Sequence, residues 1–122
     1  MEMSLDENEV LNRIYDLLYC LGASPNYVGY FYIAYAVFLA LEDSKRLLSV
    51  TKLLYPSVAQ YCQTNWKAVE RDIRTVVSVI WKTNPSLLSE YAGFPLTDKP
   101  ISSRFLSILT AYYLRIYAQD FP

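Results

Sequence analysis

The sequence predicts an all-α protein built around one core. Along most of its 122 residues, apolar side chains recur at the three- and four-residue spacing of a helix, and the alternation typical of strands is absent. The three glycines and six prolines stand mainly between these periodic stretches, where they would end one helix and begin the next. A hydrophobic fraction of 53% suits one buried core at this length, so we expect a single domain over residues 1–122.

The first two helices are predicted from their end signals. Ser4 begins a capping box, and leucines and isoleucines then recur at helical spacing up to Gly22, a plausible left-handed stop. Ser24 and Pro25 supply an N-cap and a first-turn proline for a second helix that runs to Leu41. This second segment is apolar nearly all round, which predicts that it lies at the centre of a helical bundle.

The middle of the chain is punctuated by a proline. Asp43 or Ser44 can cap a third helix, which must end near Tyr55 because Pro56 cannot continue its hydrogen bonding. Pro56 then opens a short helix that ends at Cys62. A tight polar turn follows this short helix.

The longest periodic segment runs from Thr64, its expected N-cap, to Lys82. On a helical wheel, one face holds five β-branched residues: Val69, Ile73, Val76, Val77 and Ile80. The opposite face holds the polar residues Lys67, Glu70, Arg71, Arg74 and Ser78, within an arc of about 100°. One face is therefore suited to the core, and the other to solvent or a ligand.

The last third of the chain is expected to hold two more helices. The first covers residues 85–91, and a loop over 93–100 follows it. Ser102 or Ser103 then caps a final helix that runs toward Ala118.

Charge is unevenly distributed along the chain. The net charge is only -1, but residues 1–16 carry five acidic side chains and one basic one. Residues 44–83, in contrast, carry seven basic side chains against two acidic ones. A basic middle segment is compatible with a nucleic-acid partner even where the whole chain is not basic.

Composition argues against several other classes of protein. The chain has no histidine, and Cys20 and Cys62 do not form a closely spaced pair, so we expect neither a metal site nor a cofactor. No glycine-rich phosphate loop or nucleophile-base pair is evident, and Glu70 and Asp72 point to different faces, so we expect no enzyme. The acidic N-terminus is unlike a secretory signal, and the apolar stretch 27–41 is too short to span a bilayer, which predicts a cytoplasmic protein without a membrane partner.

The short helix, the polar turn and the long amphipathic helix together form a helix-turn-helix pattern. Such a unit places its second helix in the DNA major groove. Arginine can bond guanine as a fork, glutamate can accept from cytosine N4, and lysine, threonine and asparagine can hold phosphate. The charged face at 67–78 has these chemistries.

Three segments of the chain resemble one known family. LLYPSVAQYCQTNWKAVERDIRTVVSVIW, at 53–81, looks like the helix-turn-helix region of the C-terminal effector domain of the stage zero sporulation protein A transcription factor. LGASPNYVGYFYIAYAV at 21–37 resembles the family's leading helices, and KPISSRFLSILTAYYLR at 99–115 resembles its last one. The resemblance implies a six-helix domain that binds short promoter boxes through the major groove, with neighbouring copies in head-to-tail contact.

The resemblance also implies roles for individual residues. Glu70 and Arg71 match positions that contact bases, and Arg74 matches one that contacts a base edge or the backbone. Phosphate contacts would come from the helix start at Thr64 and Asn65, and Lys67, which departs from the family pattern, could supply another. Contacts between copies would come from three tyrosines of the final helix: Tyr112, Tyr113 and Tyr117.

The chain departs from the family pattern at the helix that would read DNA. Lys67 and Ala68 stand where a serine and an arginine are usual, Thr75 replaces a histidine, and Trp66 replaces a small residue. A lysine does not replace the bidentate fork of an arginine. The family's receiver domain, with its alternating strands and acidic pocket, has no counterpart in these residues.

Two functions are therefore compatible with the sequence. The first is a sequence-specific regulator of transcription that binds double-stranded DNA through the helix at about 65–83 without a receiver. The second is a degenerate module that pairs with a full-length relative, or antagonises it, through its last helix.

Overall fold

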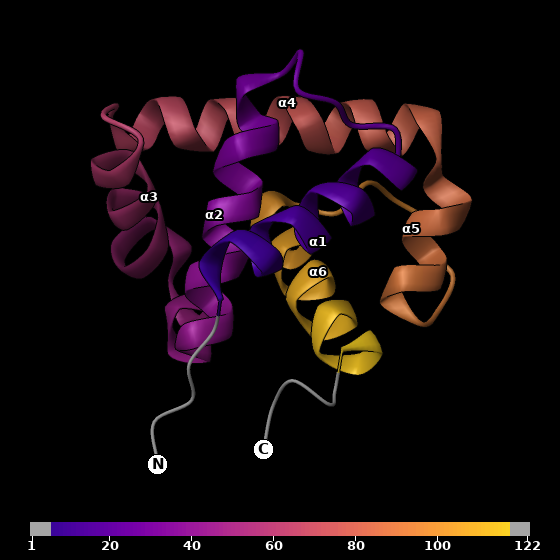
Figure 1. The fold of residues 1–122 in the computed structure, drawn as a ribbon. Coiled ribbons are helices and arrows are strands. Elements are labelled where there is room, and N and C mark those ends of the chain that lie inside the picture. The colour runs from indigo at the N-terminus through magenta and orange to yellow at the C-terminus, as the bar shows by residue number, and fades with distance from the viewer. Residues whose placement is uncertain (1–5, 118–122) are drawn as a thin grey trace.

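The computed structural model describes residues 6–117, and within that range the chain is all-α, as the sequence predicts (Figure 1). Six α-helices form the fold, and two short helical turns of other types, η1 and η2, lie between the second and the third. The elements are α1 Glu7–Cys20, α2 Val28–Glu42, η1 Ser44–Leu48, η2 Val50–Leu54, α3 Tyr55–Tyr61, α4 Trp66–Thr83, α5 Pro85–Ala92 and α6 Ser102–Ile116.

Helix α2 is the centre of the core. Eleven of its residues are buried, and it packs against α1, α3, α4 and α6. Figure 1 shows it running away from α4 between α1 and α3. This confirms the prediction that the second helix, which is apolar nearly all round, lies at the centre of the bundle.

The starts of α1 and α2 differ from the prediction. Asp6 caps α1 by accepting a hydrogen bond from the Glu9 amide, while Ser4 lies outside the described residues. Helix α2 does not begin at Pro25: the Tyr27 amide bonds the Ser24 carbonyl, so residues 24–27 form a separate turn.

The expected third α-helix was also wrong. Ser44–Leu48 is a 3-10 helix, the backbone is extended at Ser49, and Val50–Leu54 is one turn of π-helix. Tyr55 is the first residue of α3 rather than the end of a preceding helix, and Pro56 lies in the first turn of α3 as expected.

The last two helices have the expected positions, and the cap of α6 differs from the prediction. Pro85 begins α5, and Gly93, in the left-handed region (φ 85°), is its C-cap. Ser102 and Ser103 are the first two residues of α6 and not its cap: the N-cap is Ile101, which makes no capping bond through its side chain. The predicted end of this helix at Ala118 lies outside the described residues.

Candidate nucleic-acid interface

Helix α4 is held against the core by the five residues that the wheel placed on its inner face. Val69, Ile73, Val76, Val77 and Ile80 are all buried, which confirms that prediction. The helix crosses α2 at Gly29, where the backbones nearly touch. A Cβ added to Gly29 would lie 2.1 Å from the Asp72 carbonyl oxygen, so this crossing excludes any larger residue.

The turn before α4 fixes where the helix begins. Gln63 has a φ of 57°, and the Thr64 amide bonds the Ala59 carbonyl at 2.9 Å. The predicted cap at Thr64 was wrong by one residue, because the Asn65 side chain accepts from the Ala68 amide at 2.9 Å. Helices α3 and α4 therefore form the helix-turn-helix unit that the sequence predicts.

The two arginines of α4 project from its outer face. Their side chains are 65% exposed at Arg71 and 60% exposed at Arg74. The Arg71 Nε donates to Asp72 Oδ1 at 3.2 Å, and this hydrogen bond and the Asp72 charge raise the pKa of Arg71. Both guanidinium groups therefore stand where a duplex could reach them.

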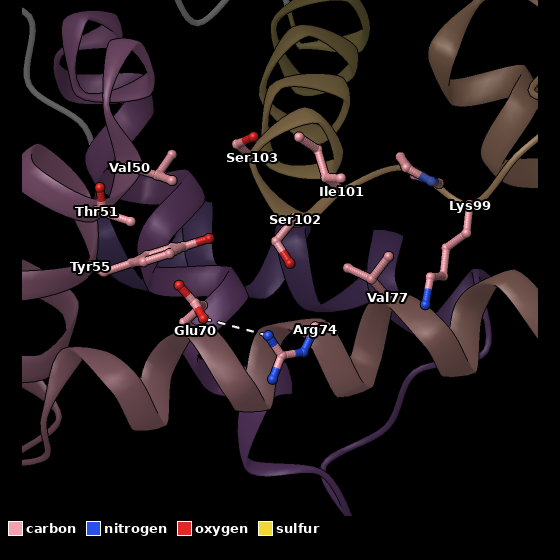
Figure 2. A pocket seen from close by; sticks show the side chains of 11 residues that line it. Val50, Thr51, Tyr55, Glu70, Arg74, Val77, Lys99, Ile101, Ser102 and Ser103 are labelled. Carbon is pink, nitrogen blue, oxygen red and sulfur yellow. Dashed lines mark hydrogen bonds and ion pairs between the residues drawn. The ribbon is translucent and has the colours of Figure 1, made fainter.

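Glu70 and Arg74 lie on a shoulder of α4 rather than on its outermost ridge. The Arg74 Nη1 donates to Glu70 Oε1 at 3.4 Å, one helical turn away. Both side chains line a cavity between α4, the start of α3 and the start of α6 (Figure 2). Lys67 and Arg71 do not line that cavity. The predicted DNA contacts therefore lie on two parts of α4, with Lys67 and Arg71 on the ridge and Glu70 and Arg74 on the shoulder.

The residues predicted to contact phosphate differ in their exposure and in what their side chains contact. Lys67 is exposed, and its ammonium lies 5.9 Å from the Trp66 ring centroid. Thr64 is half-buried in the turn, while the Asn65 side-chain oxygen already serves as the cap. Sequence reasoning missed Lys99, whose Nζ donates to Ser78 Oγ at 3.0 Å and so adds a positive charge beside α4.

The three tyrosines that were predicted to make contacts between copies instead pack within the fold of one chain. Tyr113 has 0% exposure, so its prediction as a surface contact was wrong. Tyr112 is half-buried and stacks on Tyr91 with ring centroids 4.1 Å apart. Tyr117 is also half-buried, beneath the Arg13 guanidinium.

Two apolar residues of α6, Leu114 and Ile116, are exposed, although sequence reasoning did not single them out. Leu114 falls outside the helical spacing of the buried face at 105, 106, 109 and 113, whereas Ile116 falls on that spacing, in the last turn of α6. The spacing was a signal available in the sequence for Leu114, and it also places Tyr113 in the core.

Two features are absent from the described part of the chain. Over residues 6–117 no group of three or more cysteine, aspartate or glutamate side chains is arranged to hold a metal ion. None of the helices in the same range is both long and apolar enough to cross a membrane.

A helix-turn-helix whose second helix carries an open, arginine-bearing face defines an all-α DNA-binding domain. Comparison with known families agrees with this class. Residues 14–113 match the family described as sporulation initiation factor Spo0A C terminal. The chain belongs to this family of DNA-binding transcription factor domains from sporulation regulators.

Proposed function

We propose that the chain binds double-stranded DNA with sequence preference by placing the outer face of α4 in the major groove. The observation that carries the proposal is the exposure of Arg71 and Arg74, at 65% and 60%, opposite the buried stripe of the same helix. An amphipathic helix that presents forked donors outward has the shape and chemistry that the major groove accepts.

Each residue then has a distinct role. Arg71 on the ridge donates to a guanine edge, while Glu70 and Arg74 contact bases from the shoulder. Lys67 holds a phosphate, and Thr64 and Asn65 bring the start of α4 close to the backbone. Because Asn65 also caps the helix, its contribution to binding includes keeping that start in place.

The ion pairs on α4 do not obstruct this role. Arg71 is paired with Asp72, and Arg74 with Glu70, at the surface. Exposed pairs of this kind are worth only about 0–1 kcal/mol. A bidentate contact to the right base contributes roughly 1–3 kcal/mol of discrimination against other bases, so a weak surface pair does not prevent an arginine from selecting a base.

Selection from a random duplex pool, run at two salt concentrations, tests the proposal. We expect an enriched sequence whose affinity falls steeply with salt. Lys67→Ala should weaken binding to all sequences and flatten the salt slope by about one. As the matched control, Lys45→Ala removes a charge of η1, which packs against α2, η2 and α6, and should change neither. A wild-type chain that binds no duplex at low salt excludes this function.

A second function is favoured by one observation on α6. Leu114 and Ile116 leave apolar surface exposed beside Arg115, and Ala68 removes the arginine that the family pattern has on α4. We infer that this end of α6 is where the chain would pair with a full-length relative. A pull-down with that relative, lost on Leu114→Glu and retained on Leu48→Glu, would support pairing; Leu48 is an equally apolar exposed residue of η1.

A further inference from the structure

A cavity of about 340 Å³ lies on the shoulder of α4; we call it the shoulder cavity (Figure 2). Its walls come from the η2–α3 junction, from α4, and from residues 99–103 before and at the start of α6. Sites for small molecules are typically concave and hold about 300–1,000 Å³. The shoulder cavity is therefore of a size for a small ligand.

Much of the wall is apolar. The apolar groups that line it are Val50, Val77, Ile101 and the Tyr55 ring. Ile101 is 72% exposed. Val50 begins the π-helical turn, in which its carbonyl accepts from the Tyr55 amide. Single π-turns often occur at functional sites, and an apolar ligand body placed here would cover surface that the fold leaves open to water.

The polar part of the wall carries a net positive charge. Arg74 and Lys99 supply two cations against the one carboxylate of Glu70. Arg74 is paired with Glu70, whereas Lys99 bonds only the neutral Ser78 hydroxyl, and none of the ion pairs in the described range includes Lys99. Figure 2 shows the Lys99 side chain reaching from the 99–103 segment toward α4 beside Val77, and the Arg74 guanidinium turned toward Glu70 on the other side of Val77. An occupant with one negative charge matches this wall.

Further hydrogen-bond donors line the cavity between Lys99 and the η2–α3 junction (Figure 2). The Ser102 and Ser103 hydroxyl groups belong to the lining. Burial and the nearby Glu70 carboxylate raise the pKa of Tyr55 to about 12, so its phenol stays protonated and able to donate. The cavity thus combines apolar wall residues with hydrogen-bond donors and two cations.

We propose that the shoulder cavity binds a small amphipathic carboxylate, with its apolar tail against Val50 and Ile101 and its carboxylate between Lys99 and Arg74. Such a ligand competes with Glu70 for the Arg74 guanidinium. Because Glu70 and Arg74 are base contacts in the proposed function, on which this consequence rests, the ligand lowers DNA affinity. By linkage, DNA lowers the affinity for the ligand by the same factor.

Octanoate is the probe for the first experiment, which uses backbone amide NMR of the whole chain and needs no DNA. We expect saturable shifts confined to residues 50–55, 70–77 and 99–103. Octanol lacks the charge and butyrate lacks the apolar length, so each should bind at least about fivefold more weakly. If octanoate produces no saturable shift at these residues up to about 10 mM, its affinity is weaker than millimolar and the proposal is overturned.

Two exposed side chains allow the cavity to be altered without touching the core. Lys99→Met keeps the apolar stem and removes the charge, and Ile101→Ser removes apolar wall; each should weaken octanoate binding about fivefold. Lys82→Met is the matched control, because Lys82 is an exposed cation of α4 that does not line the cavity. Equal octanoate affinity in wild type and in Lys99→Met contradicts the assignment.

A second experiment, with DNA, distinguishes the proposed ligand site from the proposed DNA-binding function. With the selected duplex, saturating octanoate should raise the Kd for DNA by about fivefold or more in wild type. If the chain binds no DNA, the proposed function fails while the octanoate titration still decides the cavity. If DNA binds and octanoate does not, with duplex-induced shifts at 99–103, the cavity seats a backbone phosphate and the carboxylate site is excluded.

Discussion

Helices α2 and α4 cross at Gly29, and they show two ways of using a helix of similar length. Helix α2 is buried on nearly every side and has no charged residue before Glu42. Helix α4 buries one stripe and keeps its charges on the other. The fold therefore depends on α2, while the proposed recognition depends on α4, and the two can be perturbed separately if the crossing is left intact.

The largest expected effect on stability comes from breaking the crossing itself. Gly29→Ala places a methyl group against the Asp72 carbonyl, and no side-chain movement can relieve a clash with backbone. We expect the free energy of unfolding to fall by about 3 kcal/mol, the upper end for overpacking. Chemical denaturation measures this loss, and Val28→Ala, at an exposed position of the same helix, should cost less than about 0.5 kcal/mol. Equal effects of the two substitutions would show that the backbones are not in contact.

The second effect is a pH dependence of the free energy of unfolding, which arises at Tyr55 in the wall of the shoulder cavity. Burial raises the pKa of Tyr55 to about 12, above the ordinary 10.0 of the unfolded chain. The neutral phenol is thus favoured in the folded state, so its contribution is complete below pH 10 and is lost as the pH rises from 10 to 12. Linkage gives a loss of about 1–2 kcal/mol over that window, after allowance for solvent screening.

Denaturation at pH 9 and at pH 11.5 measures that loss, and Tyr55→Phe should reduce it. Tyr19 is exposed and serves as the control, since Tyr19→Phe should leave the pH dependence as it is. An unchanged slope in Tyr55→Phe would assign the alkaline loss to other groups.

The smallest effect distinguishes the two possible caps of α4. Asn65→Ala removes the side-chain bond to the Ala68 amide and should cost about 1 kcal/mol of stability. Thr64→Ala should cost clearly less, since the Thr64 contact in this turn is made by its backbone amide. Thermal unfolding of the two variants side by side decides between them, and the reverse order would restore Thr64 as the cap.

The sequence predicted the two faces of α4 because β-branched and charged residues alternate there at helical spacing. It did not predict the break at Ser49 or the π-turn after it, since residues 44–54 have no glycine or proline to signal a change. The position of Glu70 beside a cavity was equally out of reach. That position depends on where residues 99–103 pack, and such long-range placement leaves no local pattern.

The most direct test of the account is the affinity of Arg71→Glu for the duplex selected by wild type, measured together with its unfolding midpoint. We predict a loss of about 1–3 kcal/mol in binding with an unchanged midpoint, because the Arg71 side chain is largely exposed and contributes little to the fold. An affinity equal to that of wild type would contradict the reading of DNA by α4.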